Sequence, residues 1–221
     1  MSKSKAKNQG RARKQKGGSW EAKLAKDLTY YSSHGNEFRK VVGSGAYMGG
    51  TNRLKNLGIN TGAQIALSGD ILGPDGWPFS IECKNTKANP RFHLMLLKGD
   101  SAVDGFLQET CFDAYWNGLI PLLAMKRTFR GEFMMIPRKL EIYFLEEAKG
   151  LTSQDTYNRM DYIYRGNDLI QTDPDIPIYT KNWVMFDCAF FCFFVENFWK
   201  AAQTLRDDEK NKNDKPLQED S

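Results

Sequence analysis

The segment at residues 119–129, LIPLLAMKRTF, constrains the fold most strongly, because it is an almost continuous apolar run of strand length. A strand that is buried on both faces carries such a run, whereas a half-exposed strand alternates apolar and polar residues. Residues 102–117, AVDGFLQETCFDAYWN, come directly before it and are expected to form a helix that ends at Gly118. The two segments together predict a central strand that is covered by helices.

The segments on either side extend this plan. Residues 20–31 are expected to form a helix, because Trp20, Leu24, Leu28 and Tyr31 follow one another at spacings of four, four and three. The strand-like segments are, in chain order, EFRKVV at 37–42, AQIALSGDIL at 63–72, FSIECKN at 79–85 and GEFMMIPRKL at 131–140. The order helix, three strands, helix and two strands predicts an α/β fold with a mixed central sheet flanked by helices.

A loop rich in glycine and proline separates two acidic residues, Asp70 and Glu82. If these two residues lie opposite each other, the loop covers residues 73–79, GPDGWPF, whose glycines and prolines suit a loop and would disrupt a paired strand. Residues that face each other across a ladder project to the same side, so Asp70, Glu82 and Lys84 would share one surface. A tighter turn at residues 73–76 would shift the register and send Asp70 and Glu82 to opposite faces.

Two carboxylates on a shared surface repel each other, and each raises the pKa of the other. A divalent cation removes that repulsion and takes hard oxygen ligands, which suits Mg²⁺. The backbone carbonyl of Cys83 is a candidate third ligand beside Asp70 and Glu82, and Lys84 would reach an attacking water or a phosphate. Metal-assisted phosphodiester hydrolysis uses these groups. The alternative interpretation is that the charged side chains simply face water.

These motifs resemble those of the PD-(D/E)XK nuclease superfamily, with glycine in place of the proline of the name-giving pattern. The matching residues are Gly69, Asp70, Glu82, Cys83 and Lys84, with Glu21 in the first helix as an additional acid. The resemblance covers about residues 18–130 and implies a restriction-endonuclease-like core. It also implies an enzyme that cuts DNA with Mg²⁺, or with Mn²⁺ in its place. The implied catalytic residues are Glu21, Asp70, Glu82 and Lys84, and the implied metal ligands are Asp70, Glu82, the Cys83 backbone carbonyl and Glu21.

Within the superfamily the chain is most similar to the Holliday-junction-resolvase branch of archaea and phages. The similarity lies in the glycine-rich loop VVGSGAYMGG at 41–50 and in a helix that carries Gln108 and leads into an apolar strand ending at Lys126. It implies a branched DNA substrate, a part in DNA recombination or repair, and a homodimer. Ser44 is a candidate phosphate contact, Gln108 a candidate contact to water or DNA, and Lys126 a candidate clamp on the DNA backbone.

The basic residues of the chain are concentrated at its N-terminus. Residues 1–17 hold seven Lys or Arg and no acid, whereas the net charge of the whole chain is only +4. This composition is typical of a disordered arm, and such an arm binds DNA phosphates by releasing counterions. Arg11, Arg13 and Lys14 are therefore candidate DNA contacts, and a tail that only aids solubility is the alternative.

The sequence divides into four expected parts: a disordered arm at 1–17, a nuclease core at 18–139, a C-terminal extension at 140–204 and a disordered tail at 205–221. The extension ends in a strongly aromatic run, WVMFDCAFFCFFVENFW. Such a run is expected either to pack on the core or to be buried against a second copy of the chain.

The composition also excludes some classes of protein. The longest apolar runs are interrupted by charges, and the basic N-terminus is followed by no apolar segment, so neither a membrane helix nor a secretory signal is expected. The four cysteines form no CxxC pair and are expected to be buried, reduced thiols, which fits the cytoplasm, or the host cytoplasm for a phage protein.

Two rival functions stay open at this point. One is another nuclease of the same superfamily, of the restriction-like, nicking or recombination exonuclease kind. The other is a DNA-binding or assembly protein that keeps the fold and performs no chemistry.

Overall fold

The computed structural model describes six ranges of the 221-residue chain: 18–32, 37–41, 69–86, 101–127, 131–148 and 183–213. Within them a single six-stranded sheet runs in the spatial order β1-β2-β3-β4-β5-β6. The strands are β1 (Arg39–Lys40), β2 (Ile71–Leu72), β3 (Phe79–Thr86), β4 (Ile120–Arg127), β5 (Gly131–Pro137) and β6 (Trp183–Asp187). The pair β3–β4 is parallel and all other pairs are antiparallel, so the predicted mixed sheet is confirmed.

The apolar run that was expected to be a central strand is β4, which lies between β3 and β5 in the sheet. Its residues from Ile120 to Met125 are all buried. A parallel pair requires a crossover connection, and the helix α5 (Ser101–Trp116) lies between β3 and β4 in the chain. The helix expected at 102–117 is therefore confirmed to within one residue at each end.

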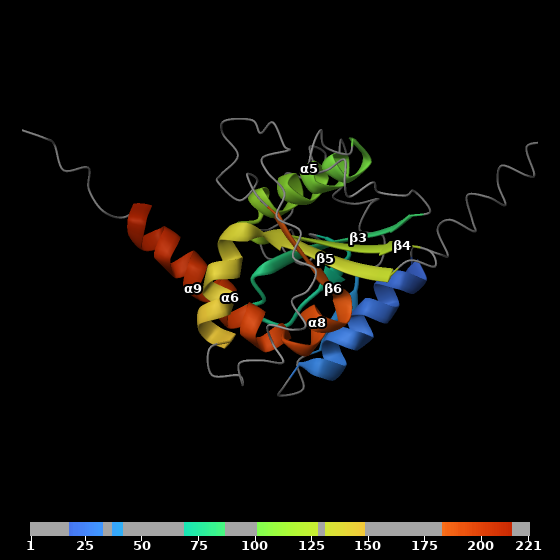
Figure 1. Ribbon diagram of the computed structural model, residues 1–221, viewed down its shortest axis with the longest axis horizontal. Helices are drawn as coiled ribbons and strands as arrows, with labels where there is room; N and C mark the ends of the chain where they lie inside the picture. The colour runs from blue at the N-terminus through green and yellow to red at the C-terminus, as the bar shows by residue number, and fades with distance from the viewer. Residues whose placement is uncertain are drawn as a thin grey trace, which may run out of the picture.

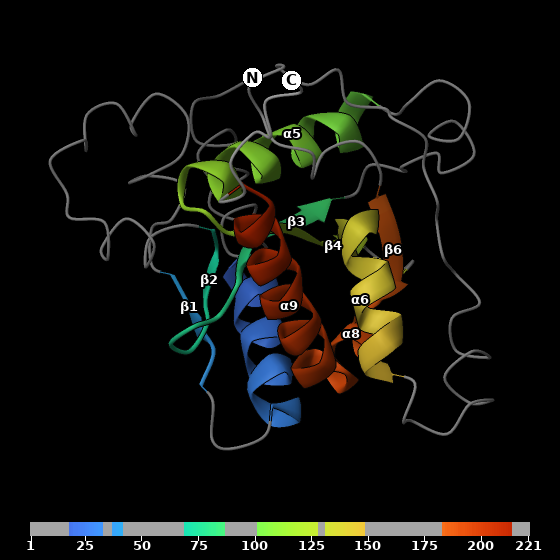
Figure 2. The same ribbon diagram turned by 90° about the vertical axis from the view of Figure 1, so that its left-hand side faces the viewer.

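Helices cover both faces of the sheet (Figures 1 and 2). Figure 2 shows α5 across one side and, on the other side, the helix at 18–31 together with α6 (Arg138–Ala148), α8 (Cys188–Phe193) and α9 (Val195–Asn213). Alternate residues of β4 separate the two layers, because Leu122 and Ala124 belong to the larger apolar cluster and Leu123 belongs to the cluster under α5.

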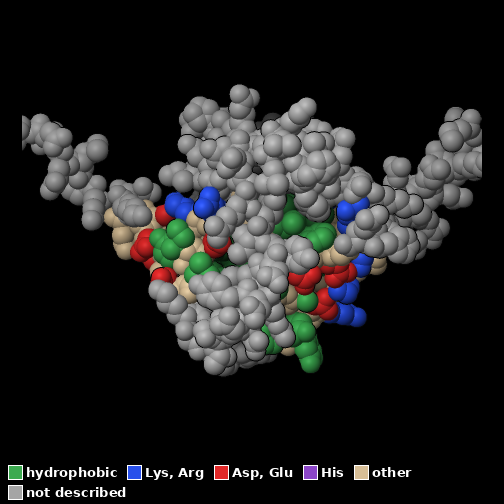
Figure 3. Space-filling view, in the orientation of Figure 1, with side chains coloured by type: hydrophobic (Ala, Val, Ile, Leu, Met, Phe, Trp, Pro, Cys, Tyr) green, Lys and Arg blue, Asp and Glu red, His purple; other side chains and the backbone are tan. Residues whose placement is uncertain are grey.

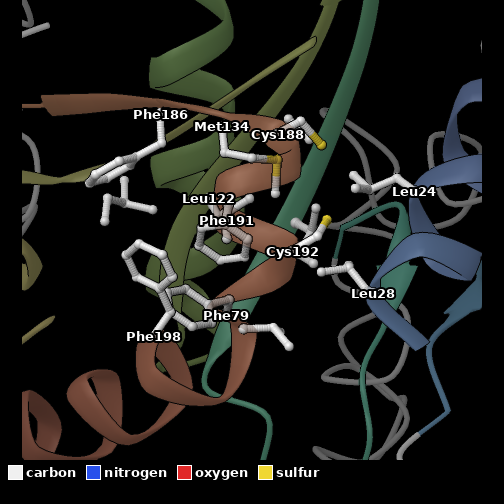
Figure 4. Packing of buried hydrophobic residues seen from close by; sticks show 14 of the residues in the cluster. Leu24, Leu28, Phe79, Leu122, Met134, Phe186, Cys188, Phe191, Cys192 and Phe198 are labelled. Carbon is white, nitrogen blue, oxygen red and sulfur yellow. The ribbon is translucent and has the colours of Figure 1, made fainter. Parts of the chain in front are cut away.

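Most rings of the aromatic C-terminal run pack inside the chain (Figure 4), whereas Phe193 is exposed. Phe198 of α9 is fully buried and stacks on Phe144 of α6, with ring centroids 4.0 Å apart, and on Phe191 of α8 at 4.4 Å. Of the two explanations that the sequence allowed, packing on the core is therefore the one that accounts for these rings.

Two boundaries differ from those expected. The segment GEFMMIPRKL divides after Pro137, where β5 ends and α6 begins, because Leu140 and Phe144, one helical turn apart, are both fully buried. Helix α9 extends to Asn213, beyond the expected start of a disordered tail at 205. Leu205 is fully buried, and Asp208 accepts a 2.8 Å hydrogen bond from Tyr143, so the helix is anchored there.

The remaining expectations about structure concern cysteines and membranes. The four cysteines are free and buried, and burial raises the pKa of the Cys111 thiol to about 12. Among the helices of the described ranges, none has the length and apolar character that a membrane span needs. The basic arm at 1–17, the glycine-rich loop at 42–50 and residues 63–68 of the expected second strand lie outside the described residues.

Candidate active site

The hairpin of β2 and β3 has the register that the longer loop requires. Ile71 pairs with Ile81 in antiparallel fashion. Asp70, the residue before Ile71, is bonded through its amide to the Ile81 carbonyl and through its side chain to the Cys83 amide, so it lies beside Glu82. The glycines and prolines of GPDGWPF form the connection before Phe79, where β3 begins. Asp70 and Glu82 are therefore neighbours, and the tighter turn that would have separated them does not form.

Asp70 is fixed by main-chain contacts on both sides. Its amide donates to the Ile81 carbonyl at 2.7 Å, and its carbonyl accepts from the Val41 amide at 2.9 Å. Its side-chain Oδ2 accepts a 2.8 Å hydrogen bond from the Cys83 amide. Asp70 as a whole is only 8% exposed. The sheet itself thus holds this carboxylate at a fixed position next to β3.

Gly69 makes the close approach of Asp70 to β3 possible. Its φ is +76°, and a Cβ at this position would lie 2.6 Å from the carbonyl oxygen of Ile81. A side chain here would meet main-chain atoms that cannot move aside without breaking the hairpin. Only glycine therefore fits at position 69 without displacing Asp70 from β3.

Gly69→Ala is expected to lower the free energy of unfolding by about 2 kcal/mol, because it combines a positive φ with a main-chain clash. Urea unfolding checks this. The matched control is Gly105→Ala in α5, where a Cβ would meet no atom within 4 Å. That variant is expected to gain about 0.5–1 kcal/mol from helix propensity. Equal stability of the two variants would contradict the assigned role of Gly69.

Glu82 and Lys84 project from the same face of β3, two residues apart. Lys84 Nζ lies 2.7 Å from Glu82 Oε1 and 2.7 Å from Oε2 of Glu109 on α5. Burial, together with the nearby Asp70 carboxylate, raises the pKa of Glu82 to about 8. Burial alone would lower the pKa of Lys84, but the Glu82 and Glu109 carboxylates raise it above its ordinary value.

Glu21 lies outside this contact set. Its Oε2 accepts from Lys40 Nζ of β1 at 2.7 Å, and its charge contributes to raising the pKa of the buried Cys83 thiol, after burial, Asp70 and Glu82. In the described ranges, no three side chains of His, Cys, Asp or Glu lie close enough together to hold a metal ion. The structure thus brings Asp70 and Glu82 together and leaves Glu21 paired with Lys40.

The donor atoms at the Asp70–Glu82 pair fit a hard divalent cation. Carboxylate oxygens are the ligands that Mg²⁺ and similar ions prefer, and a main-chain carbonyl such as that of Cys83 is of the same kind. Repulsion from Asp70 is one cause of the raised pKa of Glu82, and a bound cation would remove it.

The candidate DNA contacts within the described residues, Gln108 and Lys126, lie on opposite sides of the sheet. Gln108 is exposed on α5, one residue before Glu109. Lys126 pairs in register with Asn85 rather than with Lys84, so it faces the helix at 18–31, where its Nζ lies 5.3 Å from the centroid of the Trp20 ring. Ser44, Arg11, Arg13 and Lys14 lie outside the described residues.

Lys126 belongs to a charged network on that side of the sheet. Its Nζ donates to Glu132 Oε1 at 2.6 Å, and Lys23 donates to Glu132 Oε2 at 2.7 Å and to Asp27 at 2.9 Å. Figure 3 shows acidic and basic side chains gathered next to each other over the helix at 18–31. Burial alone would raise the pKa of Glu132, but the two lysines lower it below its ordinary value.

Comparison with known proteins agrees with this geometry. A family model described as "Phage putative PDDEXK endonuclease" matches residues 12–172, which include all of the hairpin, α5, β4 and β5. Neither the curated proteins nor the solved structures gave a match. Nucleases of this superfamily generally use divalent metal ions and act on DNA. By its matched length and by the Asp70, Glu82 and Lys84 arrangement, the chain belongs to this family of phage PD-(D/E)XK endonucleases.

Proposed function

We propose that this protein is a Mg²⁺-dependent endonuclease that hydrolyses phosphodiester bonds in branched DNA. The observation that carries the proposal is the meeting of Asp70, Glu82 and Lys84 at one end of the β2–β3 hairpin. The branched substrate is supported by the similarity of the sequence to junction resolvases.

The proposed roles follow from the chemistry of each group. Asp70, Glu82 and the Cys83 carbonyl would hold the cation, which when bound supplies Lewis-acid stabilisation of the phosphate and a more acidic water. Glu21 would join them if Lys40 released it. Lys84, with its high pKa, stays an ammonium and would orient the attacking water or neutralise charge on the phosphate. Mn²⁺ is expected to replace Mg²⁺, because both take oxygen ligands.

A substrate panel tests the proposal. Labelled four-way junction, linear duplex and single-stranded DNA are incubated with the protein in Mg²⁺, in Mn²⁺ and in EDTA. Symmetric paired nicks in the junction, absent in EDTA, are the expected result. Faster cleavage of linear duplex would favour another nuclease type of the same superfamily. Binding without cleavage under every metal condition would favour a non-catalytic DNA-binding protein.

A homodimer is part of the proposal, because paired nicks across a junction require two active sites. The sedimentation coefficient with and without junction DNA measures the oligomeric state. The support for a dimer is the resemblance to resolvases alone, since the aromatic run at 183–199 packs within the chain.

The pKa of Glu82 predicts how stability depends on pH when no cation is bound. Its ordinary value is 4.5 and its folded value is about 8, so between these pH values the folded protein holds a proton that the unfolded chain has lost. Stability from this group is therefore lost as the pH rises from about 4.5 to 8. Glu82→Gln removes this dependence while keeping the shape of the side chain.

In EDTA, Glu82→Gln is expected to gain stability over the unmodified protein steadily from pH 5 to pH 8, by up to about 4 kcal/mol, and no further above pH 8. Urea unfolding at half-unit pH steps measures the difference. Titrations of the other groups are common to both proteins and cancel. Parallel stability curves for the two proteins would show that Glu82 ionises normally.

A further inference from the structure

The ammonium group of Lys84 is held between strand β3 and helix α5. Its Nζ lies 2.7 Å from Glu82 Oε1, 2.7 Å from Glu109 Oε2 and 5.4 Å from the centroid of the Phe106 ring. Phe106 and Glu109 are three residues apart, so they lie on the same face of α5. A single helix surface therefore supplies both a carboxylate and an aromatic ring to a lysine of the neighbouring strand.

Glu82 cannot be the only anchor of Lys84 if it also binds a cation, a condition that rests on the proposed function. A cation on the Glu82 carboxylate would compete with the Lys84 ammonium for the same oxygens and repel it. Glu109 comes from a different element, the helix α5, and contacts the ammonium at 2.7 Å. Its contact with Lys84 can therefore persist when the Glu82 oxygens are engaged.

The number of N–H donors on the ammonium group also supports a separate role for Glu109. An ammonium has three N–H donors. In the described residues, its ion-pair partners are Glu82 and Glu109. If Glu109 accepts one of these donors and Glu82 binds a cation, the remaining N–H groups of Lys84 can point at a phosphate oxygen or a water.

We propose that Glu109 is a positioning residue, which holds the Lys84 ammonium beside the Asp70–Glu82 pair through its 2.7 Å contact from α5. It acts through Lys84 and touches neither the cation nor the scissile phosphate. The residue is outside the sequence motif of the superfamily, and it sits one position beyond Gln108, the α5 side chain that the motif resemblance had favoured.

If Glu109 had a purely structural role, Glu109→Gln would lower the melting temperature. The Glu109 side chain is 52% exposed, and an ion pair of that exposure contributes little to stability. Glu109→Gln is therefore expected to have the same melting temperature as the unmodified protein. Its effect should appear in kcat, lowered about 3- to 10-fold with KM unchanged, because Lys84 is less well ordered in the transition state.

The kinetic experiment compares Glu109→Gln with three other variants. Glu147→Gln removes the same charge from an exposed position on α6, on the far side of the sheet, and is expected to leave kcat unchanged. Glu109→Asp keeps the acid and is expected to recover part of the loss. In a Lys84→Ala background, Glu109→Gln is expected to cause no further loss, because its effect passes through Lys84. A full additional loss there, or a kcat equal to that of Glu147→Gln, overturns the proposal.

A second measurement needs neither cation nor cleavage. In EDTA, the rate at which acetic anhydride labels Lys84, followed by peptide mass spectrometry, is expected to rise at least about 3-fold in Glu109→Gln, because the ammonium loses one of its two carboxylate partners and is restrained by Glu82 alone. Labelling of Lys200, exposed on α9, is the internal reference. Unchanged labelling of Lys84 overturns the proposal even if the protein cuts DNA. Increased labelling in a protein that cuts no DNA would support the positioning and refute the proposed function.

Discussion

Replacing Glu82 with alanine is expected to lower the rate of DNA cleavage by a factor of about 1,000 or more while leaving DNA affinity nearly unchanged. The substitution removes the oxygens that Lys84 contacts at 2.7 Å and that lie beside Asp70. Affinity for DNA depends mainly on basic residues that contact phosphates, and Glu82 is not one of them. Loss of rate without loss of binding is the signature of a group that acts in the chemical step.

The measurement is a time course of junction cleavage in Mg²⁺, with DNA affinity determined by fluorescence anisotropy in Ca²⁺. Glu147→Ala on α6 is the matched control, since it removes an exposed glutamate from the opposite side of the sheet. The variant should also fold, because Glu82 is a largely buried acid whose pKa burial raises, so removing it removes an unfavourable charge. Cleavage by Glu82→Ala at the rate of the control would remove the basis for the assigned site.

Replacing Phe198 with alanine is expected to lower the free energy of unfolding by about 3–5 kcal/mol. The side chain is fully buried, and its ring centroid lies 4.0 Å from that of Phe144 and 4.4 Å from that of Phe191. Truncation would leave a cavity at the centre of an aromatic cluster that joins α6, α8 and α9. Stacked rings on two sides leave little room for the cavity to collapse.

Urea unfolding at a fixed pH measures this loss. Phe193→Ala is the matched control, because Phe193 is 57% exposed at the end of α8 and makes T-shaped rather than stacked contacts with Tyr31 and Phe194. It is expected to cost less than about 1 kcal/mol. Similar losses in the two variants would mean that the aromatic run is not the centre of the core.

The sequence predicts the elements whose signals are local. The apolar run of β4 and the glycines and prolines of GPDGWPF each identify their own structure, and together they locate Asp70 next to Glu82. The strand pairing β5–β6 could not be predicted in this way. Pro137 and Trp183 are partners although 46 residues separate them in the chain, and no local pattern encodes such a pairing.

The site was predictable only as far as its strands. Asp70, Glu82 and Lys84 have positions that follow from period-two alternation and one loop length. The position of Glu109 depends on how α5 is rotated about its axis over the sheet. The sequence alone does not tell which of the two neighbours, Gln108 or Glu109, points toward Lys84. Both side chains are exposed, and only packing decides that Glu109 is the one that contacts Lys84.

The pairing of β6 with β5 has a practical consequence for how this protein is produced. The family match ends at residue 172, before β6, α8 and α9 begin. A recombinant fragment cut at that boundary would retain every motif residue, yet β5 would become an open edge and Phe79 and Phe144 would lose their aromatic cover. Such a fragment is prone to aggregate and would show no activity in an assay, although the proposed catalytic residues are all present in it.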